Sequence, residues 1–66
     1  MQITHDEAIE MYARFCRARY GPEATQIVTL KANALARQGD LEGKKAWDEV
    51  AAKIDQLRKT GARSIN

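Results

Sequence analysis

The residues of this chain that could carry covalent or metal chemistry are few. The sequence has one histidine, His5, and one cysteine, Cys16. A structural zinc site takes four ligands, and no second His or Cys stands at ligand spacing from either residue. A Cys-His nucleophile pair is also excluded, because the two residues are about three turns apart on one predicted helix. We therefore expect no metal, no cofactor and no small-molecule substrate, and a protein that is not an enzyme.

The stretch RFCRARYG, residues 14–21, interleaves arginines with aromatic residues. This mixture is typical of surfaces that grip nucleic acid. Along a helix, however, each residue advances by about 100°, which separates the two types. Arg14 and Arg17 fall opposite the apolar residues, whereas Phe15 and Tyr20 fall among them. The pattern therefore favours a solvated face for the arginines and places Phe15 and Tyr20 in the core.

Three further side chains in the helical pattern need an interpretation. Cys16 shares the apolar sector of the first helix and is predicted to be a small buried hydrophobe. Arg19 and Lys31 also project into apolar sectors, and long basic side chains there extend their charged ends to solvent. Arg19 has a carboxylate on another helix as an alternative partner. Whether Arg19 and Lys31 are structural or ligand-binding stays open.

Glycine, proline and capping residues divide the chain into helices. Thr4-His5-Asp6-Glu7 has the pattern of a capping box, in which the threonine and glutamate side chains satisfy each other's backbone amides. Gly21 ends this first helix, and Pro22 suits the first position of the next. The sequence predicts an all-α fold, a small three-helix domain with helices at about 5–20, 22–38 and 41–59.

The second and third predicted helices are joined by about two residues, Gly39 and Asp40. Asp40 is a good N-cap, and so short a connection predicts a tight antiparallel helical hairpin. We expect a single three-helix domain over residues 1–61 and a frayed C-terminal tail over 62–66.

The third predicted helix has the cleanest apolar stripe. Trp47 is predicted to anchor the core, and Gly43, one turn before it, is predicted to allow another helix to approach closely. The second helix carries two apolar ridges, which predict that it is wedged between the other two. The stripe residues of the third helix are Gly43, Ala46, Trp47, Val50, Ala51, Ile54 and Leu57.

Composition narrows the location and the type of partner. The chain has 66 residues and a formal net charge of +2, with basic and acidic residues spread evenly over both halves. No apolar run approaches the roughly 20 residues of a membrane span, so no membrane partner is expected. A lone thiol suits a reducing compartment. We expect a cytoplasmic protein.

Apolar residues in excess of a three-helix core indicate binding to another protein. Met11 and Ala18 extend the apolar sector of the first helix, and Leu30 and Ala32 flank that of the second. The sequence therefore predicts a non-catalytic protein-protein interaction module, a small adaptor, regulator or inhibitor that self-associates through the first helix as a homodimer. The predicted protein-binding residues are Met11, Arg14, Arg17 and Ala18, which combine apolar and guanidinium groups.

The alternative is a dimeric nucleic-acid-associated regulator that uses a basic surface of the first two helices. Arg14, Arg17, Lys31 and Arg37 would supply that surface. The third helix argues against it, because its acidic residues would face the phosphate backbone.

Two blocks of the sequence carry a resemblance. ARFCRARYG, followed by LARQGDLEGKKAWDEVAAKI, resembles short all-helical bacterial open reading frames that carry no assigned function. The likeness covers most of the chain, from the first helix through the third. It implies a helical fold and a natural origin, and it brings no ligand, activity or catalytic residue.

Overall fold

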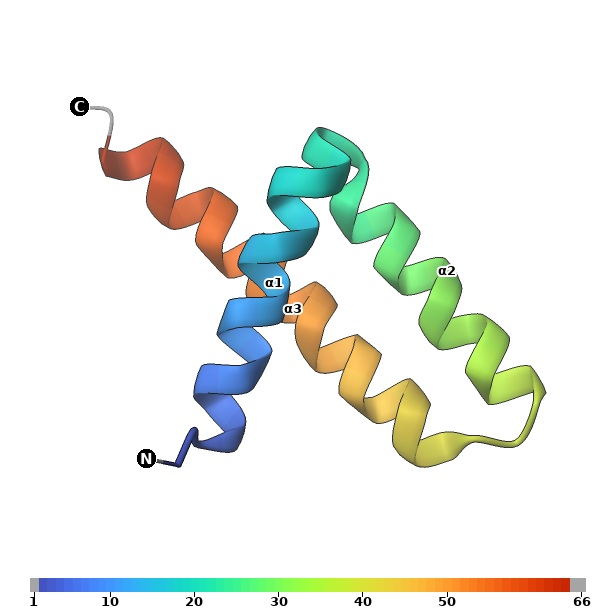
Figure 1. The fold of residues 1–66 in the computed structure, drawn as a ribbon. Coiled ribbons are helices and arrows are strands. Elements are labelled where there is room, and N and C mark those ends of the chain that lie inside the picture. Colours follow the sequence, from blue (N-terminus) through green and yellow to red (C-terminus); the bar gives the residue numbers. More distant parts are fainter. Residues whose placement is uncertain (1, 65–66) are drawn as a thin grey trace.

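The structure, a computed structural model, describes the backbone of residues 2–64 and the side chains of residues 2–59. These residues contain no strand, so the all-α prediction is confirmed. The division into separate helices is confirmed only in part. Three elements follow one another without a non-helical residue and form one bent segment, and a single long helix follows (Figure 1). The elements are α1 (His5–Tyr20), the 3-10 turn η1 (Gly21–Glu23), α2 (Ala24–Arg37) and α3 (Leu41–Ser64).

Helix α1 begins at the predicted capping box. The Glu7 backbone N–H donates to Thr4 Oγ1 over 3.1 Å, and the Thr4 N–H donates to Glu7 Oε1 over 3.0 Å. Because the Glu7 carboxylate accepts from the Thr4 backbone and side chain, its pKa lies below the usual value of 4.5. Two otherwise unpaired amides are thereby satisfied at the start of the helix.

The bend between α1 and α2 depends on Gly21. Its backbone lies at φ 64° and ψ −137°, a conformation that residues with a Cβ rarely adopt. Its N–H donates to the Arg17 carbonyl and closes the last turn of α1. Pro22 lies in η1 rather than at the first position of α2, which begins at Ala24, two residues later than predicted.

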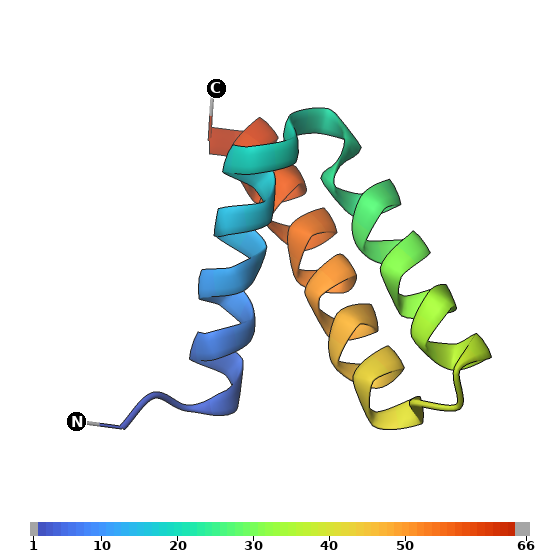
Figure 2. The same cartoon turned by 45° about the vertical axis from the view of Figure 1, so that its right-hand side comes forward.

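Helices α2 and α3 run side by side in opposite directions, as both ribbon views show (Figures 1 and 2). Asp40 caps α3, because its Oδ1 accepts from the Gly43 backbone N–H over 2.9 Å. Helix α3 continues to Ser64, beyond the end predicted at about residue 59. Residues 62–64 of the predicted tail are thus helical, and residues 65–66 lie outside the described part of the chain.

The nearest neighbour of Gly43 is a residue of its own helix end. A Cβ built on it would lie 2.6 Å from Asp40 Oδ2, within the same helical turn. The small residue therefore leaves room for the carboxylate that caps α3.

The core is built from small side chains. Cys16 is buried, as predicted, whereas Ala32, which we expected beside the apolar stripe of α2, is fully buried. Trp47 does not anchor the centre of the core. It is half-buried at the edge, together with Ile9, Ala51 and Leu57. The buried hydrophobic residues of the described chain are Ala13, Cys16, Ala24, Val28, Ala32, Val50 and Ile54.

The prediction that Phe15 and Tyr20 lie in the core is wrong. Phe15 is 54% exposed and Tyr20 38% exposed. The side of α1 that packs inward carries Ala13 and Cys16, and one residue along a helix is a turn of about 100°, so Phe15 is directed away from Cys16. The apolar sector of α1 is therefore two faces, of which only one is buried.

Candidate protein-interaction face on helix α1

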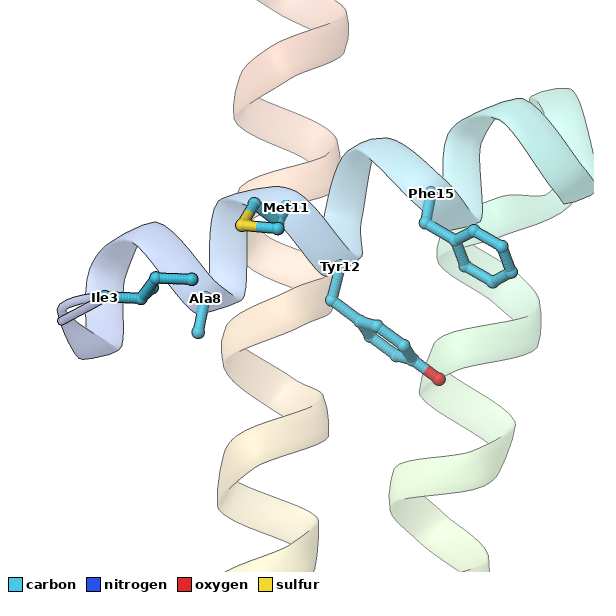
Figure 3. Close-up of a pocket in the computed structure, with 5 residues that line it drawn as sticks. All are labelled: Ile3, Ala8, Met11, Tyr12 and Phe15. Carbon is cyan, nitrogen blue, oxygen red and sulfur yellow. The ribbon is translucent and has the colours of Figure 1, made fainter. Parts of the chain in front are cut away.

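Helix α1 presents a row of apolar side chains to solvent. These side chains line a shallow hollow of about 400 Å³ (Figure 3). The Tyr12 and Phe15 rings stack within it, with centroids 5.9 Å apart. Met11 beside them is 59% exposed. We call this surface the outer face of α1, and its residues are Ala8, Met11, Tyr12 and Phe15 on the helix and Ile3 just before it.

The residues predicted to bind protein fall in different places. Met11 lies within the outer face of α1, and Arg14 borders it, because both line a second hollow of about 330 Å³. The Arg14 guanidinium also pairs with the Glu10 carboxylate, with Nη2 and Oε2 2.9 Å apart. Arg17 and Ala18 are exposed further along α1 and line neither hollow. The structure thus brings together Met11 and Arg14 only.

Phe15, which the sequence places in the core, belongs to this face instead. Ala8, Tyr12 and Phe15 recur at the four- and three-residue spacing of one helical stripe. Ala13 and Cys16 belong to a different, inward stripe. The sequence contains this signal, but apolar periodicity alone joins both stripes into one broad apolar sector. Residue size distinguishes them, since the inward stripe carries the smaller side chains.

A further hollow of about 430 Å³ lies between α1 and α3. It adjoins the outer face of α1, because Ala8 and Tyr12 line both. At its rim, His5 Nε2 lies 2.7 Å from Glu49 Oε1. Both side chains are more than one-third exposed, so this contact positions the start of α1 without contributing much stability.

Three helices meet at the indole of Trp47 in α3. The Tyr12 ring of α1 contacts it edge to face, with centroids 5.1 Å apart. From α2, Lys31 Nζ lies 5.3 Å from the ring centroid, which is the geometry of a cation-π contact. Lys31 is exposed, and its ammonium group lies over this aromatic ring rather than extending away from the protein. Arg19 is exposed near the end of α1.

The groups that could carry chemistry do not converge. Burial raises the pKa of the Cys16 thiol above its usual value of 9.0, and the Lys31 charge offsets this only in part. The thiol is thus held in its unreactive, protonated form. His5 is paired with Glu49 at the start of α1. Within the described part of the chain, no three His, Cys, Asp or Glu residues are grouped as metal ligands.

Comparison with known proteins adds no assignment. No known protein family, curated protein or solved structure matches this chain significantly. The outer face of α1 therefore has to be interpreted from its own residues.

Proposed function

We propose that this protein is a non-catalytic protein-protein interaction module, a small adaptor, regulator or inhibitor, and that the outer face of α1 is its contact surface. The favoured form is a homodimer. In this form, the three helical elements of each copy make a small three-helix domain, and α1 carries the interface.

One observation carries the proposal: several large apolar side chains in and beside α1 are exposed together, while α1 packs inward through the small residues Ala13 and Cys16. Contiguous exposed apolar surface of this kind marks interaction sites. The buried set is mostly alanine, valine and cysteine, whereas Ile3, Met11, Tyr12 and Phe15 are exposed together. A chain of 66 residues has little core to spare, so burying these side chains against a partner adds support that the monomer lacks.

The overall dimensions support the same interpretation. The Cα radius of gyration is 12.6 Å, against about 11 Å for a compact domain of this length. The shortest principal extent of the Cα trace is 16 Å. Helix axes in contact lie about 8–10 Å apart. The fold is therefore only about two helix layers thick, and the outer face of α1 has no further layer over it.

The proposal is tested with Met11→Asp, which places a charge in the middle of the outer face of α1. Sedimentation at micromolar concentration should show a dimer for the wild-type chain and a folded monomer for the variant. Leu30→Asp is the matched control, because Leu30 is also an exposed apolar residue but lies on α2. A Met11→Asp protein that stays dimeric, with its helicity intact, would overturn the proposed face.

Nucleic-acid binding is the weaker candidate. Two of the four residues that would form the basic surface have partners within the chain, Arg14 on Glu10 and Lys31 on Trp47. Titration on duplex DNA over a salt series distinguishes the two functions, since phosphate contacts weaken steeply with added salt.

For the location of the protein, we propose the cytoplasm. Cys16 is a free thiol buried in the core, which suits a reducing compartment. No helix in the described residues is both long enough and apolar enough to cross a membrane.

A further inference from the structure

We propose that the occupant of the outer face of α1 is a second copy of the same helix, packed antiparallel about a two-fold axis near Met11 and Tyr12. This inference rests on the proposed function and specifies its partner and its geometry. An isologous contact of this kind requires a surface that is complementary to itself.

The charge distribution along α1 provides that complementarity. The acidic residues of the helix are confined to its first half, and the arginines to its second half. In an antiparallel pair, the acidic half of each copy lies beside the basic half of the other, and the helix dipoles also oppose. A parallel pair would instead place like charges side by side along the whole contact. The residues concerned are Asp6, Glu7 and Glu10 in the first half and Arg14, Arg17 and Arg19 in the second.

Side-chain size also fits this arrangement. With the axis between Met11 and Tyr12, Ala8 of one copy lies level with Phe15 of the other. A small residue then faces a large ring at both ends of the contact, and Met11 faces Tyr12 in the middle. All four side chains are exposed in the single chain and line the same hollow. Small-against-large pairing lets two helices approach closely and fill the space between them.

The register places opposite charges beside this apolar centre. Glu7 and Arg14 lie on the same flank of the outer face of α1, and both border the hollow that also contains Met11. In the antiparallel pair, Glu7 of each copy comes near Arg14 of the other. Arg14 already pairs with Glu10 of its own helix, so the second carboxylate converts an isolated pair into a small network.

The first test changes one charge. Arg14→Glu should weaken the dimer at least tenfold in dissociation constant, measured by sedimentation equilibrium, because it faces Glu7 of the other copy. Arg37→Glu makes the same change at the end of α2 and should leave the dissociation constant within about twofold. Equal effects of the two variants would contradict the inferred pairing.

The second test determines the orientation. Ala8→Cys and Phe15→Cys proteins are mixed in equal amounts and oxidised gently, and the cross-linked species are identified by mass. Antiparallel packing should give the mixed disulfide, because residues 8 and 15 lie level. In that arrangement, two residues 8 are about 10 Å apart along the axis, beyond the reach of a disulfide. Cys16 is buried and serves as the internal unreactive thiol.

A spin label at Ala18→Cys gives the orientation without altering the hollow. Antiparallel packing should place the two labelled positions about 20 Å apart along the axis, whereas parallel packing would leave them about 10 Å apart.

Two outcomes would separate the self-association from its geometry. A wild-type chain that stays monomeric at 100 µM, on the order of the concentration these labels need, would overturn both the self-association and this inference. A dimer that Met11→Asp dissociates, but that cross-links only as 8 to 8 and 15 to 15, would overturn the antiparallel geometry and leave the interaction face intact.

Discussion

The Tyr12 and Trp47 rings meet edge to face, with centroids 5.1 Å apart and planes inclined at 66°. This contact joins α1 to the hairpin. It lies where the outer face of α1 adjoins the hollow between α1 and α3. Tyr12 therefore belongs to two surfaces. Its ring supports the fold through the contact with Trp47, and it also stacks with Phe15, which extends the aromatic surface toward solvent.

A double-mutant cycle of Tyr12→Leu and Trp47→Leu should give a coupling energy of about 0.5–1.5 kcal/mol, the usual size for an aromatic pair. The measurement is chemical unfolding in the Met11→Asp background, which separates folding from association. Tyr20→Leu replaces Tyr12→Leu in the control cycle, because Tyr20 lies two turns further along α1. Coupling of the same size in both cycles would show that the rings do not interact specifically.

The small core makes Ile54 the most sensitive apolar position. Ile54 is fully buried and is among the largest of the fully buried side chains. Ile54→Ala should cost about 2–5 kcal/mol and Ile54→Val about 0.5–1.5 kcal/mol in free energy of unfolding. Leu41→Ala is the control, since Leu41 is 68% exposed and its change should stay within about 0.5 kcal/mol. If Ile54→Val and Leu41→Ala cost the same, the assignment of the core would be wrong.

Local signals in the sequence locate the starts of α1 and α3, because capping chemistry is encoded within four residues. The Thr4-Glu7 box and the Asp40 cap both form as predicted. The predicted end of α3, at about residue 59, is too early, because the helix continues through Gly61 to Ser64. Propensity gives only a weak preference at such a position.

The candidate face was harder to predict from the sequence, because periodicity shows which residues are apolar but not which apolar stripe is buried. Met11 was assigned to the surface and Phe15 to the core, yet both line the same exposed hollow. Tertiary contacts decide which stripe is buried, and Ala13 and Cys16 of α1 lie in one core cluster with Val50 and Ile54 of α3. That relationship spans residues far apart in the chain.

Gly43 and Asp40 should be coupled in stability. Asp40→Ala removes the side-chain acceptor of the Gly43 N–H and should cost about 1 kcal/mol. Gly43→Ala gains helix propensity, about 0.5–1 kcal/mol, but its Cβ displaces the Asp40 carboxylate from the cap. We therefore expect Gly43→Ala to stabilise the Asp40→Ala protein more than the wild-type protein, as measured by thermal unfolding. Equal gains in both backgrounds would mean that the cap adjusts freely.

Acid should weaken the start of α1 through Glu7. The folded-state pKa of Glu7 is below its usual value of 4.5, so the charged carboxylate stabilises the fold above that pH. This contribution is lost as the pH falls through the folded-state pKa. Between pH 5 and pH 3, the wild-type protein should therefore lose more stability than the Glu7→Gln variant, whose side chain does not titrate. Parallel pH profiles for the two proteins would contradict the role of this carboxylate in the capping box.

The Cys16 thiol should react only when the fold opens. It is almost fully buried, and burial raises its pKa, so the reactive thiolate is scarce in the folded chain at neutral pH. Labelling with a thiol reagent should be slow in buffer and fast in denaturant, and the destabilising Ile54→Val change should accelerate it in buffer. Rapid labelling of the folded wild-type protein would show that α1 detaches from the hairpin more readily than the packing implies.

The direction of α1 relative to the next helix depends on the unusual backbone conformation of one residue, Gly21. A side chain there would strain the corner by about 1–3 kcal/mol. The hairpin has its own turn and cap, whereas α1 is held in place by Ala13 and Cys16 in the core and by the Tyr12–Trp47 contact. A substitution at this one position therefore works against the packing that fixes the direction of the outer face of α1.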